Sequence, residues 1–434
     1  MNYLTTTPKM IASLPHQHSL VHGILQQSVG LLRPLVLQRA ISSYYMQRLE
    51  LSRHKDVQTV HSGAVNDVDI DITENRYLLS GGSDGTIAIH DLEDLRESEH
   101  NMLDSRVYKL VCSVSPGNRN AHRRSIETVQ WYPLDTGIFT SSGADRVLKI
   151  WDANSLKTAE EYSFNGIVHS HHLSSVATKH NLIAIGSDSS IVNLVDPRAG
   201  SSTHSLRGHK EGAVRAVRWS NKDEFLLATG GIDNYAMLWD VRAAKSCLMK
   251  LRDKSKKKSG FTKDCTHDGS VNGLKFTADG LHLVTIGTDQ KVFTWDVHSG
   301  KKLSQRYPPV SHIKKRSVKF CLTRGGSPNF AFIPTGSSIT TFNISTPGKG
   351  MQMYGHYSMV NCCVYHEPGN QLVSGGNDQK ILIWTLGGDK NYDDYLCDKQ
   401  LEIMERKRVA DEETVRIVVP AAVAQTMDTW SDED

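Results

Sequence analysis

The stretch Ala228-Thr-Gly-Gly-Ile-Asp233-Asn-Tyr-Ala-Met-Leu-Trp239-Asp240 decides the fold, because the spacing of its polar residues returns in four other places. In each copy a Ser or Thr precedes an Asp by four positions, and a Trp or His follows that Asp by six positions. A further His stands 22 to 24 positions before the Asp. The five copies are His61, Ser80, Asp84 and His90; His122, Ser141, Asp145 and Trp151; His209, Thr229, Asp233 and Trp239; His267, Thr285, Asp289 and Trp295; and His356, Ser374, Asp378 and Trp384. A spacing that occurs five times is not a chance match to a short pattern.

These recurring polar residues predict a buried hydrogen-bond network in each copy. Buried polar groups are tolerated when all of them are paired, and His, Ser or Thr, Asp and Trp supply the donors and acceptors. Apolar residues alternate between the Asp and the aromatic position, as in Ile381 and Ile383, which is typical of a strand with a buried face. Loss of one member is expected to cost about 1–3 kcal/mol. The pattern indicates a structural role rather than a catalytic one.

The period of the pattern is that of the WD repeat, in which each copy forms one four-stranded blade of a β-propeller. Two weaker copies fill the gaps: 172–196 has Ala184 in the Ser/Thr position, and 314–344 has neither the Asp nor the Trp. Insertions at 93–121 and 243–266 account for the extra length. The sequence therefore predicts an all-β protein, a seven-bladed WD40 β-propeller that forms one domain at 53–388.

Cysteine and histidine usage argues against several kinds of site. The seven Cys are an odd number without a CxxC pair, which indicates free thiols rather than disulfides or a zinc site. His171 and His172 would point to opposite faces of a strand, so the cluster that they form with His169 is not expected to bind a metal. No apolar run reaches the length of a membrane-spanning helix. We expect no metal, no cofactor and no enzymatic activity.

Charge separates the C-terminal segment from the rest of the chain. The whole chain has a formal net charge of +3, whereas 389–434 carry 13 acidic and 6 basic residues. This composition predicts an acidic, largely disordered tail, in which Trp430 is an unusual residue that would suit a partner-binding anchor. The Lys-rich stretch 254–258 is expected to be a solvated loop, with nucleic-acid contact or a localisation signal as the alternatives.

The N-terminal region predicts a helix at 34–49, outside the propeller, within a helical segment at 31–52. Pro34 suits a first helical turn, and apolar residues follow it at helical spacing. The residues expected to form the binding face are Leu35, Leu37, Ile41, Tyr44 and Tyr45. This face either packs on the rim of the propeller or binds another protein. Residues 1–30 predict no clear structure, and a mitochondrial transit peptide is a third interpretation that their few basic residues disfavour.

Several stretches are similar to the Cockayne syndrome WD-repeat family, CSA. They include Leu31-Leu-Arg-Pro-Leu35, Ile126-Glu-Thr-Val-Gln-Trp-Tyr-Pro133, Gly280-Leu-His-Leu-Val-Thr-Ile-Gly-Thr-Asp289 and the terminal Trp430-Ser-Asp-Glu-Asp434. The resemblance runs from about residue 31 to the C-terminus. It extends to the positions of the blades in which the repeat pattern is degenerate. It does not cover the first 30 residues, 254–258 or 387–427, so nothing is carried over there.

The resemblance implies a nuclear substrate receptor of cullin-4 RING ubiquitin ligases, acting in transcription-coupled nucleotide-excision repair. It implies that the N-terminal helix and Arg242, in Trp239-Asp240-Val241-Arg242, bind the damaged-DNA-binding adaptor, which carries cullin-4 and the RING subunit. In Asp196-Pro197-Arg198 the match is partial, because Val195 replaces the Trp. The alternative role for Arg242 is to close the turn of its blade. The other implied partners are the CSB translocase, the UV-stimulated scaffold protein and stalled RNA polymerase II.

Two other functions remain open at this point. A propeller can serve as a scaffold without any ligase, because one fold hosts many functions. A reader of damaged DNA would need an aromatic wedge and a basic face, and the sequence offers clustered positive charge only in the Lys-rich stretch.

Overall fold

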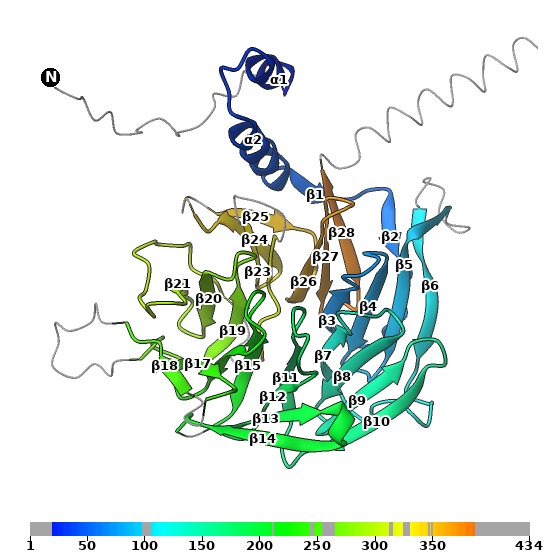
Figure 1. Ribbon diagram of the computed structural model, residues 1–434. Coiled ribbons are helices and arrows are strands. Elements are labelled where there is room, and N and C mark those ends of the chain that lie inside the picture. Colours follow the sequence, from blue (N-terminus) through cyan, green and yellow to red (C-terminus); the bar gives the residue numbers. More distant parts are fainter. Residues whose placement is uncertain are drawn as a thin grey trace, which may run out of the picture. The chain divides into compact units, whose positions relative to one another are not determined.

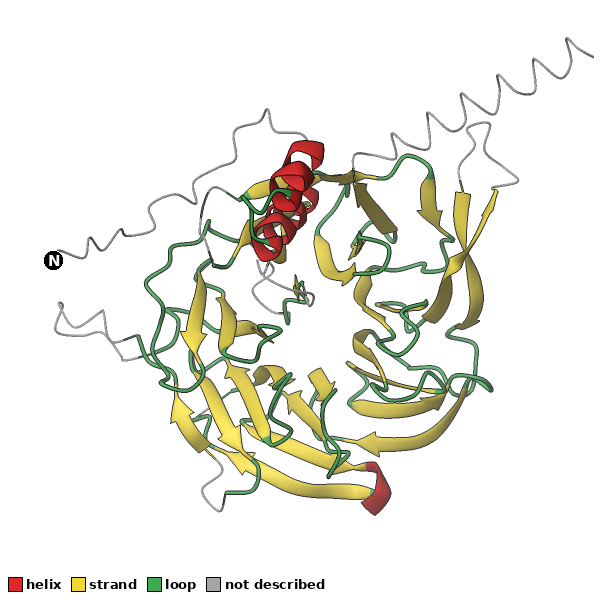
Figure 2. Ribbon diagram, turned by 45° about the horizontal axis from the view of Figure 1, so that its top comes forward, coloured by secondary structure: helices red, strands yellow, loops and turns green. Residues whose placement is uncertain are grey.

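The computed structural model describes residues 20–386, apart from gaps at 98–105, 211, 244–246, 254–264, 312–315, 324–329, 346–347 and 349. Over this range the strands form seven sheets arranged in a ring (Figure 2). The prediction of a seven-bladed WD40 β-propeller is confirmed. The predicted tail at 389–434 and the Lys-rich stretch 254–258 lie outside the described residues.

Each blade starts at its innermost strand and continues outward along the chain. The strands are, in blade 1, β3 (Val65–Ile70), β4 (Tyr77–Gly82), β5 (Ile87–Glu97) and β6 (Arg106–Val114), with β2 (Lys55–Val57) beside β6; in blade 2, β7 (Ile126–Trp131), β8 (Ile138–Gly143), β9 (Val147–Asp152) and β10 (Lys157–Ser163); in blade 3, β11 (Val168–Leu173), β12 (Ile183–Ser187), β13 (Ile191–Asp196) and β14 (Ser201–Arg207); in blade 4, β15 (Val214–Trp219), β16 (Leu226–Gly231), β17 (Ala236–Asp240) and β18 (Cys247–Lys250); in blade 5, β19 (Val271–Phe276), β20 (His282–Gly287) and β21 (Val292–Asp296); in blade 6, β22 (Cys321–Leu322), β23 (Phe330–Thr335), β24 (Ser338–Asn343) and β25 (Met351–Tyr354); and in blade 7, β26 (Val360–His366), β27 (Gln371–Gly376) and β28 (Ile381–Leu386).

The hydrophobic core is divided among the spaces between neighbouring blades. Between blades 3 and 4, for example, Val192 and Leu194 pack with Val217, Trp219 and Met237, and all five side chains are fully buried. A blade buries one face against each neighbour, so its stability depends on the blades beside it. This arrangement explains why the whole ring behaves as one structural unit.

The N-terminal strand closes the ring. Strand β1 (Leu49–Leu51) pairs antiparallel with β28 and forms the outer strand of blade 7. Leu49 is buried in a core cluster that includes Phe332 of blade 6 and Trp384 of blade 7. Blade 7 in turn meets blade 1, where the Asn361 side chain donates to the Val65 carbonyl at 2.9 Å. The two ends of the propeller segment are thus held together by both main-chain and side-chain contacts.

Two helices precede β1: α1 (Leu20–Ser28) and α2 (Pro34–Met46), the second of which leads directly into the strand (Figure 1). The helical segment predicted at 31–52 is therefore too long, because residues 49–51 pair with blade 7 instead of extending the helix. Helix α1 lies in a region for which the sequence predicted no clear structure. None of the described helices is both long enough and apolar enough to cross a membrane.

The region expected to be an insertion at 93–121 is largely part of blade 1. Strand β5 continues to Glu97, and β6 returns from Arg106 as the next strand outward. Parallel pairing of β2 with β6 makes this the one five-stranded sheet among the described strands. The hydrophobic pattern did not show this, because only two of the nine side chains of β6, those of Tyr108 and Val114, are buried.

The propeller has two faces, the His face and the helix face. The His face holds the loops that contain His61, His122, His209, His267 and His356, together with the turns between the second and third strands of each blade. The helix face holds the loops after the first and third strands, including Arg242, and the end of β28 where the chain from α2 enters β1.

Candidate protein-binding faces

One hydroxyl group links two buried side chains in blade 2. Trp151 Nε1 donates to Ser141 Oγ at 2.7 Å, and that oxygen lies 2.6 Å from His122 Nε2. His122 Nδ1 lies 2.7 Å from Asp145 Oδ2. A neutral imidazole with its proton on Nδ1 satisfies the whole set, because Nδ1 then donates to the carboxylate and Nε2 accepts from the hydroxyl.

Blades 4, 5 and 7 contain the same arrangement, with each contact between 2.7 and 3.0 Å. The sets are His209, Thr229, Asp233 and Trp239; His267, Thr285, Asp289 and Trp295; and His356, Ser374, Asp378 and Trp384. Burial opposes the ionisation of Asp145, Asp233 and Asp289, yet hydrogen bonds from His and backbone N–H groups leave the pKa of each below its ordinary value. These polar groups are hydrogen-bonded to one another, so they are not placed to act on a substrate.

Blade 1 departs from this arrangement. His61 Nε2 lies 2.8 Å from Ser80 Oγ, but its Nδ1 is 3.8 Å from Asp84, beyond hydrogen-bond distance. His90 takes the place of the Trp and contacts the Gln58 carbonyl through Nε2 at 2.9 Å. Burial lowers the pKa of His90 to about 4. Blade 1 is therefore held by a smaller network and contains a neutral buried His.

The dense histidine cluster is used for contacts between blades. His169 Nε2 lies 2.6 Å from Asp188, so the His of blade 3 that contacts this carboxylate stands three residues before the predicted start of the weak copy at 172. His171 lies between the hydroxyls of Thr140 and Ser142, at 2.8 and 2.7 Å. Among the residues that the structure describes, no group of His, Cys, Asp or Glu is arranged to bind a metal.

Blade 6, which lacks the network, contributes a buried cation to the centre of the ring. The Lys319 ammonium donates to Thr128 Oγ1 at 2.6 Å and lies 3.4 Å from Asp67 Oδ2. These partners belong to blades 2 and 1, so one side chain links three blades. Burial lowers the pKa of Lys319, while Asp67 favours its charged form. Sequence reasoning missed this contact, because it occurs once and joins residues far apart in the chain.

Arg242 lies on the helix face, at the end of the third strand of blade 4. Its guanidinium makes two hydrogen bonds to the Asp240 carboxylate, at 3.1 and 2.9 Å, and lies 4.3 Å from the centre of the Phe225 ring. Its backbone N–H also donates to Asp240, so it helps to close the turn. The side chain is still 57% exposed. Arg242 is therefore held in one orientation while it remains open to a partner.

The predicted binding face of α2 is only partly available. Leu35 and Tyr44 are 67% and 48% exposed, whereas Leu37 is buried and Ile41 and Tyr45 are half-buried. Helix α1 and the turn after it add further exposed apolar side chains, those of Ile24, Leu25, Val29 and Leu31. Buried Met46 anchors the end of α2 in the core between blades 6 and 7. The two helices thus present an apolar surface from a fixed point on the ring.

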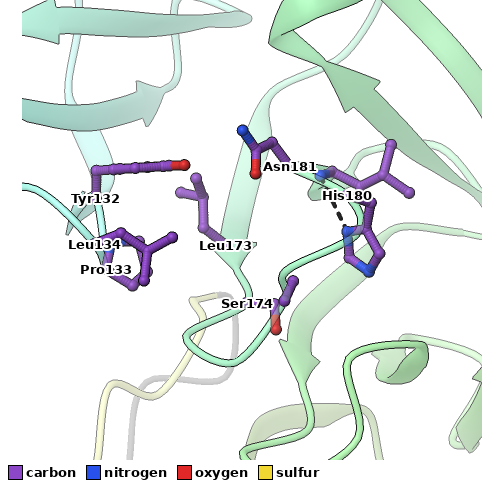
Figure 3. Close-up of a pocket in the computed structure, with 9 residues that line it drawn as sticks. Tyr132, Pro133, Leu134, Leu173, Ser174, His180 and Asn181 are labelled. Carbon is purple, nitrogen blue, oxygen red and sulfur yellow. Dashed lines mark hydrogen bonds between the residues drawn. The ribbon is translucent and has the colours of Figure 1, made fainter.

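A small cavity lies on the helix face between blades 2 and 3. Figure 3 shows Tyr132, Pro133 and Leu134 on one side of it, with Leu173, His180 and Asn181 on the other. Its volume of about 10 Å³ has room for roughly one water molecule. A site for a small organic ligand is usually some hundreds of Å³. This cavity is too small for such a ligand.

The repeat pattern and the fold agree with comparisons to known proteins. The family model for the WD domain, G-beta repeat, matches residues 54–91, 113–152, 200–240, 261–296 and 348–385. The chain is similar to the WD repeat-containing protein ATCSA-1 of Arabidopsis thaliana, with 27% identity across 94% of this chain and 99% of that protein. It is also 24% identical to the nuclear distribution protein nudF of Aspergillus niger, across 61% of this chain and 60% of that protein. A ribosome biogenesis protein WDR12 homolog of Drosophila willistoni is 33% identical across 30% of each chain.

Proposed function

We propose that this WD40 propeller is a CSA-like substrate receptor of a cullin-4 RING ubiquitin ligase, acting in the nucleus in transcription-coupled nucleotide-excision repair. The observation that carries the proposal is the pair of helices that presents exposed apolar side chains beside the closed ring. The likeness to ATCSA-1 supports it, because that likeness covers nearly the full length of both chains. The nudF and WDR12-type relatives share only part of their length with this chain.

The proposed anchor is the apolar surface of α1 and α2. An exposed Leu or Tyr that becomes buried in a partner's groove contributes roughly 1.5–3 kcal/mol. We propose that this groove belongs to the damaged-DNA-binding adaptor, which carries cullin-4 and the RING subunit. Because Met46 and Leu49 fix the end of the helix in the core, a partner that binds α2 also fixes the orientation of the whole propeller.

The role of the receptor in this proposal is to position a target. The transfer of ubiquitin to a lysine belongs to the RING subunit and its E2 enzyme. A rigid ring that holds the target raises the local concentration of its lysines near the charged E2. The CSB translocase, the UV-stimulated scaffold protein and RNA polymerase II are the proposed partners on the side that the adaptor leaves free.

The anchor is tested by titrating the purified adaptor with surface variants. The double substitution Leu35→Glu and Tyr44→Glu places charge on the exposed part of α2 and should weaken binding by at least about tenfold. The matched control is Leu248→Glu with Tyr357→Glu, which changes the same residue types at exposed positions away from the helices. Equal affinities of the two double variants would contradict the proposed anchor.

Arg242 is tested separately in the same titration. Arg242→Ala removes a guanidinium that Asp240 already orients, and we expect the adaptor to bind about 1–3 kcal/mol more weakly. The control is Arg198→Ala, at the site where the match to the family box is only partial. If Arg242→Ala leaves the affinity unchanged, Arg242 only closes its turn. If the unaltered chain does not bind the adaptor, a scaffold without a ligase becomes the better proposal.

A further inference from the structure

Four arginines lie on two adjacent loops of the His face, in blade 2. Arg119, Arg123 and Arg124 lie in the loop before β7, and Arg146 lies in the turn between β8 and β9. All four side chains are exposed. We infer that this cluster is a docking site for a carboxylate-rich peptide segment of a partner protein.

The two loops that carry the arginines are bound to each other. The Arg123 N–H donates to Asp145 Oδ2 at 3.3 Å, and the Ala144 N–H donates to the Ser125 carbonyl at 2.8 Å. Beneath them, the buried Lys149 ammonium donates to the Asn120 carbonyl at 2.9 Å. The cluster therefore rests on an ordered support, and binding a ligand would not require the loops to fold.

The carboxylates at this site are paired with groups other than the four arginines. Within the described part of the chain, none of the four arginines forms an ion pair with a carboxylate. Asp145 and Glu127 lie below them, with side chains only 7% and 13% exposed. Asp145 is bound to His122 and Glu127 lies near Arg316. A third carboxylate, that of Glu161, is 50% exposed and lies 3.5 Å from the Lys149 ammonium. Each of these carboxylates is thus paired with a group other than the four arginines.

The turn at Arg146 has the same backbone conformation as in the other regular blades. Its φ is +69°, in the left-handed region. The corresponding positions in blades 1, 4, 5 and 7 hold Gly85, Asn234, Gln290 and Gln379, whose φ values are +83°, +68°, +62° and +67°. Blade 2 differs from these blades in the charge of the residue, because it carries a guanidinium where they carry glycine or an uncharged amide.

A short acidic peptide fits this cluster better than a nucleic acid does. A guanidinium matches a carboxylate in a two-pronged, charge-assisted hydrogen bond, and arginine clusters are a recurring way to recognise acidic motifs. A nucleic-acid duplex places phosphates along an extended surface, so a protein that binds it needs cations spread along that surface. Here the other exposed cations of this face, such as Lys210 and Lys380, lie on separate blades. Four guanidinium groups on two adjacent loops suit a short run of carboxylates.

The inference rests on the proposed function only in assigning the peptide to a target or co-factor protein of the ligase. Binding to blade 2 does not involve α2 or Arg242, so it is expected with or without the adaptor. A failure of the peptide experiment therefore leaves the adaptor titration unaffected, and the reverse also holds.

The test measures binding of a fluorescein-labelled peptide of alternating Asp and Glu to the full chain at physiological ionic strength, by fluorescence anisotropy. Arg123→Glu with Arg124→Glu should weaken binding by at least about tenfold. The matched control, Lys210→Glu with Lys380→Glu, makes the same change of charge on the same face and should alter the affinity less than about twofold. Equal losses in both variants would overturn the site, because they would indicate attraction by overall charge.

Arg146→Gly separates binding from folding. It removes one guanidinium and also relieves the left-handed strain, so the peptide should bind more weakly while the melting temperature does not fall. Unchanged peptide affinity would remove Arg146 from the site. The same chain is tested with a peptide of alternating Asn and Gln and with a DNA duplex. Equal binding of the uncharged peptide, or tighter binding of the duplex, would overturn the assignment of an acidic peptide.

Discussion

At the residue scale, stability depends on hydroxyl groups that each serve two buried partners. In blade 2, Ser141 contacts both Trp151 and His122, and removal of its oxygen leaves two polar groups without that partner. In blade 1, Ser80 contacts His61 and donates to the Ala88 carbonyl at 3.3 Å, while His90 occupies the Trp position and contacts Gln58 instead. Loss of the hydroxyl therefore leaves two buried side chains without that partner in blade 2, but only one buried side chain in blade 1.

We predict that Ser141→Ala lowers the free energy of unfolding by about 2–4 kcal/mol, because each buried group left unpaired costs about 1–3 kcal/mol. Ser80→Ala is the matched control and should cost about 1 kcal/mol less. Urea unfolding followed by tryptophan fluorescence measures both values. Equal costs in the two blades would contradict the network as described.

The neutral buried His90 predicts a dependence of stability on pH. Its pKa is lowered by burial to about 4, from an ordinary value of 6.5, so between these values the unfolded chain binds a proton that the folded chain does not. Stability from this group is therefore complete above pH 6.5 and falls as the pH drops toward 4, by about 1.4 kcal/mol per unit.

His90→Gln, which cannot titrate, should reduce that slope by the equivalent of about one proton. Free energies of unfolding measured at intervals from pH 7 to pH 4.5 test this, with the parent chain as reference. A variant whose slope equals that of the parent would show that His90 is protonated in both states or in neither.

At the element scale, the key feature is that β1 belongs to blade 7 although it precedes blade 1 in the sequence. Helical spacing continued to Leu49 in the sequence, so the helix was predicted to reach it. Pairing with β28 and burial beside Trp384 determine the strand instead, because tertiary contacts override local propensity. Helix α1 was not predicted, because it has only nine residues, no acidic residue in its first turn and no basic residue in its last turn.

A chain that begins at Met46 keeps β1, whereas a chain that begins at Arg53 lacks it. We predict that the first folds with a melting temperature close to that of the full chain. The second should melt at a lower temperature and aggregate, because β28 becomes an exposed edge and the core around Trp384 opens. Thermal melts with light scattering compare the two, and indistinguishable melts would contradict the closing role of β1.

At the scale of the whole molecule, the spacing of residues predicts the ring because the spacing repeats in every regular blade. It does not predict the contacts that occur once, such as Lys319 with Asp67 and Thr128 across the centre. It also does not predict the arginine cluster, since the loop before β7 and the turn after β8 come together only in the folded blade. Packing likewise decides which residues of the predicted α2 binding face are buried and which are exposed, and it places Leu37 inside and Leu35 outside.

The measurement that tests the central claim most directly is co-purification with the damaged-DNA-binding adaptor of cullin-4 ligases. It compares the full chain with the chain that begins at Met46, which lacks α1 and most of α2 but keeps β1. The account predicts a stable equimolar complex for the full chain and none for the shorter chain, with both forms folded by circular dichroism. A complex that survives the truncation, or a folded full chain that binds no adaptor, would contradict it.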